Sequence, residues 1–74
     1  MEIKPLRKDL ERFITSHNLK NQWEKVKSFF ENDVRHPSLH TELLEPRWHG
    51  IYYFRLDKKY RALFFIIEGK AEIF

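Results

Sequence analysis

Two arginines in the second half of the chain have the type and spacing needed to hold a phosphate group. Arg55 and Arg61 flank the polar stretch Asp-Lys-Lys at residues 57–59. If these three residues form the loop of a β-hairpin, Arg55 lies directly across from Arg61 on one face of a sheet, where the two positive charges repel each other. An anion bound between them removes the repulsion, and guanidinium groups bind phosphate oxygens in a fork-like geometry. A two-residue loop would instead place Arg55 opposite Ala62, so the phosphate site depends on the register.

The segment that contains these arginines concentrates the positive charge of the chain. Between residues 46 and 61, five basic residues accompany a single acidic one. We therefore expect an anionic partner such as RNA, bound in addition by Arg47, Lys58 and Lys59. Tyr53 shares a strand face with the first arginine in either register and could stack on a base. The alternatives are a charged hairpin that only faces water and a half-buried tyrosine that only packs.

Three of the four histidines, His36, His40 and His49, lie in the connection before the two arginines. The first two have the spacing of a helical metal site, but Pro37 separates them and the pattern offers no third ligand, so we expect no metal. A histidine titrates near neutral pH and can move a proton at a ribose hydroxyl or a leaving oxygen, which makes His40 and His49 candidates for acid–base catalysis. Hydrogen bonding within the loop is the alternative. The sequence has no glycine-rich nucleotide motif and no Ser-His-Asp arrangement, and we expect no cofactor.

The composition indicates one small globular domain spanning residues 1–74. Hydrophobic residues make up 42% of the chain and charged residues 34%, which is too apolar for a disordered protein. The absence of cysteine excludes disulfides and thiolate metal sites and is typical of the cytosol. The longest apolar run, residues 62–67, is too short to span a bilayer, and the charged N-terminus lacks the apolar region of a signal peptide. We therefore expect a cytoplasmic protein with no membrane partner.

Apolar residues recur at helical spacing in two windows of the first half. The first window, residues 5–16, begins with Pro5, which is tolerated in a first helical turn, and ends before His17 and Asn18. The second window, residues 19–32, carries an aromatic-rich stripe that is typical of a helix facing a core. The short connection between the windows predicts an antiparallel helical hairpin, whose shared apolar stripe needs a sheet to cover it.

The second half of the chain predicts strands. Pro37 and Pro46 exclude a continuous helix between residues 33 and 50, which we interpret as an ordered connection. Stretches rich in aromatic and β-branched residues follow at residues 50–56, 60–67 and 70–74. The last two of these stretches are joined by a two-residue Glu-Gly loop, and a loop of this length predicts that Ile67 pairs with Lys70. The predicted fold is α+β, with the helical hairpin packed on a small twisted antiparallel sheet, and a further strand at residues 1–4 is left open.

Three stretches of the second half carry a family resemblance: HPSLHTELLEP, GIYYFRLDKKYRALF and EGKAEIF. Together they resemble the RelE/ParE superfamily of type II toxin–antitoxin toxins, over residues 34–74, and the hairpin is their most specific part. The resemblance implies two helices on a twisted antiparallel sheet and an antitoxin that wraps the toxin. For the RelE-like branch it implies a metal-independent endonuclease that cuts mRNA in the ribosomal A site through attack of the ribose 2′-hydroxyl on the neighbouring phosphate.

The resemblance also assigns roles to individual residues. Arg61 matches the arginine that the family carries on its central strand, and Arg55 falls where the preceding strand commonly has a basic residue, so both are expected to stabilise the transition state. RelE-like chains usually continue beyond the point that matches Phe74 with a histidine, tyrosine or arginine for acid–base chemistry, and the resemblance leaves open whether this chain is active, attenuated or inactive without that segment. The last strand would offer an edge that an antitoxin segment could extend. A ParE-like inhibitor of DNA gyrase and a non-catalytic, antitoxin-binding remnant are the alternatives.

Overall fold

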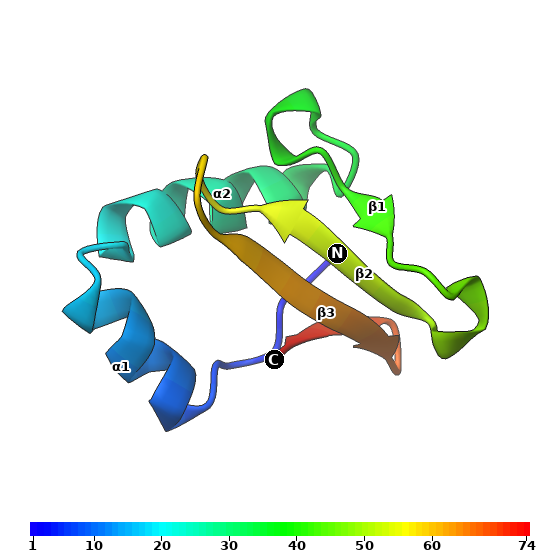
Figure 1. Ribbon diagram of the computed structural model, residues 1–74, viewed down its shortest axis with the longest axis horizontal. Helices are drawn as coiled ribbons and strands as arrows, with labels where there is room; N and C mark the ends of the chain where they lie inside the picture. The colour runs from blue at the N-terminus through cyan, green and yellow to red at the C-terminus, as the bar shows by residue number, and fades with distance from the viewer.

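Two helices precede a four-stranded antiparallel sheet in this computed structural model, which describes residues 1–74 (Figure 1). The helices are α1 (Lys8–Ser16) and α2 (Lys20–Asn32). The strands, in their order along the chain and across the sheet, are β1 (Glu42–Leu43), β2 (Ile51–Arg55), β3 (Arg61–Ile67) and β4 (Lys70–Ile73). Two 3-10 helices, η1 (Pro37–Leu39) and η2 (Arg47–His49), lie before and after β1. The predicted α+β fold is confirmed.

Helix α1 begins at Lys8, so the prediction that it starts at Pro5 is wrong. The reason is that the preceding segment joins the sheet. The Lys4 N–H donates to the carbonyl of Ala71 over 2.8 Å, and the Ala71 N–H donates to the carbonyl of Glu2 over 2.9 Å. This short parallel bridge beside β4 keeps the segment extended, and the helix starts only after the chain has left the sheet.

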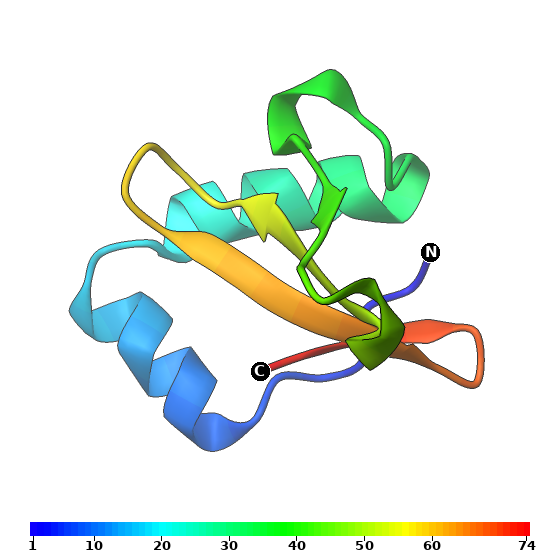
Figure 2. The ribbon, with the colours of Figure 1, turned by 45° about the vertical axis from the view of Figure 1, so that its right-hand side comes forward.

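The two helices diverge from a short turn and form a V (Figures 1 and 2). Asn18 supplies the turn with a left-handed backbone (φ 55°), a conformation that asparagine tolerates better than most residues. Helix α2 then ends at Asn32, as predicted. Helix α2 packs on the sheet through Trp23, which stacks on Phe54, and through Phe30. Neither helix has the length and apolar character needed to cross a membrane.

The hydrophobic core lies between the helices and one face of the sheet. All 13 buried residues are hydrophobic, and an aromatic cluster from α2, β2 and β3 lies at the centre. The ring of Phe30 lies 5.1 Å from the ring of Phe54 and 5.1 Å from that of Phe64, measured between centroids. Burying one such side chain contributes roughly 1.5–3 kcal/mol, so this cluster fixes α2 against the sheet.

Side chains alternate between the two faces of the sheet, and the helices cover only one of them. On β3, Ala62 and Phe64 are buried, whereas Arg61 and Phe65 point the other way. We call this second side the open face. Its residues are Glu42 from β1, Ile51, Tyr53 and Arg55 from β2, Arg61, Leu63, Phe65 and Ile67 from β3, and Lys70 and Glu72 from β4. The arginines lie at the end next to the β2–β3 loop, and the apolar residues lie along the middle.

Phe64 and Phe65 are neighbours that point to opposite faces, and they form a matched pair for a stability test. Phe64→Ala removes a ring from the aromatic cluster, and we expect the free energy of unfolding to fall by about 3–5 kcal/mol. Phe65→Ala removes a partly exposed ring from the open face, and we expect a loss below about 2 kcal/mol. Urea denaturation followed by circular dichroism measures both values. Equal losses would contradict a core on one face only.

Candidate functional site

The β2–β3 hairpin has the three-residue loop on which the phosphate site depends. The Leu56 N–H donates to the carbonyl of Tyr60 over 2.9 Å, which closes the loop. In this register Arg55 lies opposite Arg61, while Ala62 faces Phe54. The expected arginine pair is therefore present, and the alternative register with Arg55 opposite Ala62 is wrong.

The loop keeps this length because of the Asp57 side chain. Its Oδ1 accepts the backbone N–H of Lys59 over 2.8 Å and that of Tyr60 over 2.7 Å. An aspartate that binds the backbone two and three residues ahead replaces the hydrogen bonds of a regular turn. One carboxylate thus fixes the loop and, with it, the position of both arginines.

The arginine pair has no carboxylate partner within the protein. Three ion pairs occur, Lys4 with Glu72, Arg7 with Asp9 and Lys70 with Glu2, and none includes Arg55 or Arg61. Both arginines are exposed. Two positive charges directly opposite each other on a sheet are unfavourable, and a bound anion would make them favourable.

Tyr53 and Glu42 complete the cluster on the open face. The Arg61 guanidinium lies over the Tyr53 ring, 5.1 Å from its centroid, in a cation–π contact. The Tyr53 hydroxyl donates to Oε2 of Glu42 over 2.5 Å, because β1 pairs Glu42 directly with Tyr53. One side of the tyrosine ring is thus covered by Arg61, and its hydroxyl holds the Glu42 carboxylate on the same face of the sheet as the arginines.

The hydrogen bond to Glu42 raises the pKa of Tyr53 above its ordinary value of 10.0. Partial desolvation and the negative charge of Glu42 act in the same direction, whereas the positive charges of Arg61 and Arg55 lower the pKa. The tyrosine therefore stays protonated at neutral pH and remains a hydrogen-bond donor to the carboxylate.

The remaining predicted site residues divide between the two ends of β2. Lys58 and Lys59 are exposed in the β2–β3 loop and extend the basic surface next to the arginine pair. Arg47 and His49 lie in η2, beyond the opposite end of β2. The five residues of β2 span about 13 Å at the usual rise per residue, so the structure does not bring Arg47 or His49 to the arginine pair.

His40 lies at the near end, next to β1. Continuing the β1–β2 register by two residues would bring His40 opposite Arg55, but the left-handed backbone at His40 (φ 50°) ends the ladder there. The other histidine of this segment, His36, stacks on Phe29 with 4.1 Å between ring centroids, and its Nδ1 accepts the Ser38 N–H. No group of three or more His, Cys, Asp or Glu side chains is placed to hold a metal ion.

Two residues of interest were missed by the sequence analysis. Glu42 belongs to a strand of only two residues, which leaves no periodic signal, and only its pairing with Tyr53 brings it to the site. Trp48 is 82% exposed and contacts His49 edge-on, with 4.1 Å between centroids. Its position between two basic residues could have suggested a contact surface at the far end of the sheet.

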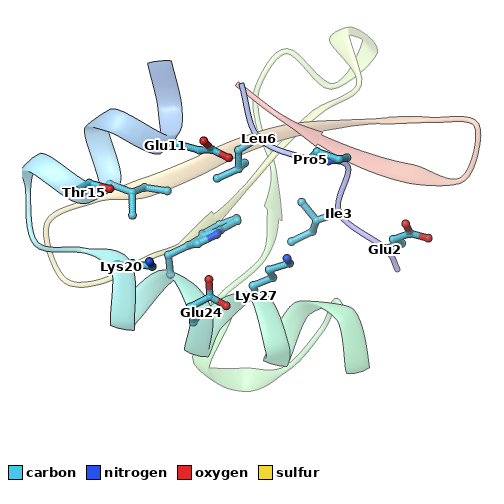
Figure 3. A pocket seen from close by; sticks show the side chains of 11 residues that line it. Glu2, Ile3, Pro5, Leu6, Glu11, Thr15, Lys20, Glu24 and Lys27 are labelled. Carbon is cyan, nitrogen blue, oxygen red and sulfur yellow. The ribbon is translucent and has the colours of Figure 1, made fainter. Parts of the chain in front are cut away.

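The largest hollow of the surface lies elsewhere, between the N-terminal segment and the two helices. It has a volume of about 550 Å³, and Figure 3 shows the side chains around it. Its charged residues are mixed, with Glu2, Glu11 and Glu24 beside Lys20 and Lys27. Because positive and negative groups alternate there, this hollow selects for neither anions nor cations.

The comparison with known proteins leaves the family open. No protein-family model matches this chain, and a search of curated proteins finds no match. Membership of the RelE/ParE superfamily therefore stays a prediction, based on the three stretches of the second half and on the residues of the arginine site.

Removing the carboxylate should change how Tyr53 titrates. In Glu42→Gln we expect the pKa of Tyr53 to fall towards its ordinary value, because the variant lacks the charged acceptor and leaves the two arginines nearby. The ¹³Cζ shift of the tyrosine ring, followed by NMR against pH, measures the change, and Tyr53→Phe assigns the resonance. An unchanged pKa in Glu42→Gln would show that the hydrogen bond to Glu42 does not set it.

The repulsion within the arginine pair should lower the free energy of unfolding of the protein. Arg55→Gln removes one of the facing charges, and we expect the free energy of unfolding at low salt to rise by a few tenths to about 1 kcal/mol. Salt should reduce this gain, because it screens exposed charges. Urea denaturation at low and high salt measures it, with Lys70→Gln, which removes a charge paired with Glu2, as the matched control. A destabilised Arg55→Gln protein at low salt would contradict the repulsion.

Proposed function

We propose that this protein is a RelE-like toxin of a type II toxin–antitoxin system, an endoribonuclease that cuts mRNA on the ribosome and inhibits translation. One observation carries the proposal: Arg55 and Arg61 lie opposite each other on an exposed face, and neither has a carboxylate partner. The sequence resemblance of residues 34–74 and the α+β fold support it. The reaction needs no cofactor and takes place in the cytoplasm, where its substrate is.

The reaction follows from placing the scissile phosphate between the two guanidinium groups. The ribose 2′-oxygen attacks the phosphorus, and the bond to the 5′-oxygen of the next nucleotide breaks. The products are a 2′,3′-cyclic phosphate and a free 5′-hydroxyl. Negative charge grows on the non-bridging oxygens during this step, and two positive charges that are already in place stabilise it.

Glu42 is the carboxylate suited to accept the proton of the 2′-hydroxyl. The Tyr53 hydroxyl donates to its Oε2 and so fixes its orientation, while its second oxygen accepts no hydrogen bond from the protein. We assign the protonation of the leaving 5′-oxygen to His40, which lies next to β1. His49 has no part in this scheme, because it lies beyond the other end of β2.

An antitoxin is the second partner that the proposal requires. Leu63, Phe65 and Ile67 follow Arg61 along β3 on the open face, and no helix covers them. A segment with apolar side chains and carboxylates would cover this apolar middle and pair with the two arginines. Such a partner blocks the phosphate site and covers the exposed apolar surface at the same time.

Primer-extension mapping of a defined mRNA in a reconstituted translation reaction tests the proposed activity. We expect codon-phased cuts that need ribosomes, and Arg61→Ala should reduce the cleavage rate by about 10²–10³-fold, as expected when one group that stabilises a developing oxyanion is lost. Lys70→Ala, on the same face but distant from the pair, is the control and should cut normally. Full activity of Arg61→Ala would refute the assigned site.

A ParE-like inhibitor of DNA gyrase is the second candidate, and the exposed indole of Trp48 favours it. A tryptophan is a frequent hot spot of protein–protein interfaces, and Trp48 lies at the opposite end of the sheet from the arginine pair. Intact mRNA together with inhibited DNA supercoiling would select this candidate and reject the nuclease.

A further inference from the structure

A recess between α2, η1 and the β2–β3 loop lies directly beside the arginine pair. Its volume is about 340 Å³. Val26, Phe29 and Leu56 are its apolar residues. The polar groups around it are Gln22, Lys25, Ser38, Arg55, Asp57 and Lys58. Arg55 therefore belongs both to the arginine pair and to this recess.

The charged side chains around the recess have a net positive charge. Lys25, Arg55 and Lys58 take part in none of the three ion pairs. The only carboxylate, Asp57, already accepts two backbone N–H groups through its Oδ1, as part of the loop. Three positive charges against one carboxylate leave a net charge of +2 around the concavity, and this charge produces a local potential that attracts a compact anion.

The walls of the recess are held in place by contacts between its elements. The Gln22 side chain donates through Nε2 to the carbonyl of Leu56 over 2.8 Å, which ties α2 to the end of β2. The Lys25 ammonium lies 5.9 Å from the centroid of the Phe29 ring, and the imidazole of His36 stacks on the same ring. Helix, hairpin and η1 are thus connected, and a ligand would meet a preformed site rather than three independent side chains.

We propose that this recess binds a second phosphate of the RNA backbone, one that flanks the phosphate held by Arg55 and Arg61. The inference rests on the proposed nuclease function and adds to it the path of the substrate. Because Arg55 is shared, the two sites are continuous, and a polymer with one anionic group per repeat can occupy both at once. The hydroxyl of Ser38 and the two lysines supply donors for the phosphate oxygens. The RNA strand would then pass from the open face around the end of β2 towards α2.

Salt-dependent binding of an uncleavable RNA tests the recess separately from catalysis. The probe is a short single-stranded RNA with 2′-O-methyl groups, labelled for fluorescence anisotropy. Lys25→Gln should weaken binding several-fold and reduce the slope of log K against log salt by about 0.7–1, the value for one lost phosphate contact. The matched control is Lys20→Gln, which removes an exposed lysine of the same helix that lines the mixed-charge hollow of Figure 3. It should keep most of the affinity and the slope.

The possible outcomes separate the recess from the proposed function. If Lys25→Gln matches Lys20→Gln while Arg61→Ala still weakens binding, the recess proposal is overturned and the arginine site stands. If the unaltered protein does not bind the RNA, the recess proposal is rejected, whereas the nuclease function is decided by the primer-extension assay with ribosomes. An acidic peptide of equal charge that binds the protein more tightly than the RNA, with the same dependence on Lys25, would overturn the assignment of RNA as the ligand. Because Lys25 is exposed, urea denaturation should show that the variant folds normally.

Discussion

The carboxylate of Asp57 holds the β2–β3 hairpin in its register, and the arrangement of both faces of the sheet depends on that register. A shift by one residue would move each side chain of a strand to the other face. The aromatic rings that pack under α2 would then point to solvent, and the two arginines would no longer be neighbours. Two hydrogen bonds from the loop backbone to one side chain therefore determine where the core forms and where an anion can bind.

The two faces of the sheet make opposite contributions to the free energy of the protein. On the inner face, Phe30, Phe54 and Phe64 provide stability through burial. On the open face, the facing arginines repel each other, and the cation–π contact of Arg61 with Tyr53 opposes that repulsion. A domain of this length has a total stability of only about 4–11 kcal/mol, so the compact aromatic cluster is what allows the unfavourable pair to persist.

The sequence predicts the parts of the structure that follow from local patterns. The stripe of α2, the two hairpins and the pairing of Ile67 with Lys70 all follow from periodicity and loop length. The start of α1 could not be obtained in this way, because the hydrogen bonds that keep residues 2–4 extended come from β4, at the other end of the chain. His49 is close to Arg55 in the sequence, but the length of β2 separates it from the arginine pair in space. Glu42 and the recess beside α2 depend on contacts between distant segments, for which one sequence holds no signal.

The bridge between Ile3 and Ala71 has a consequence for the order of events during synthesis. A ribosome produces the chain from its N-terminus, so the first segment remains without its partner until Ala71 has emerged. The turn between α1 and α2 and the β2–β3 hairpin contain only local contacts, so they can form earlier. The parallel bridge closes a loop of nearly the whole chain and therefore forms late. The outer side of β4 is therefore the last part of the sheet to be protected, and the nascent protein holds its arginine pair before its fold is complete.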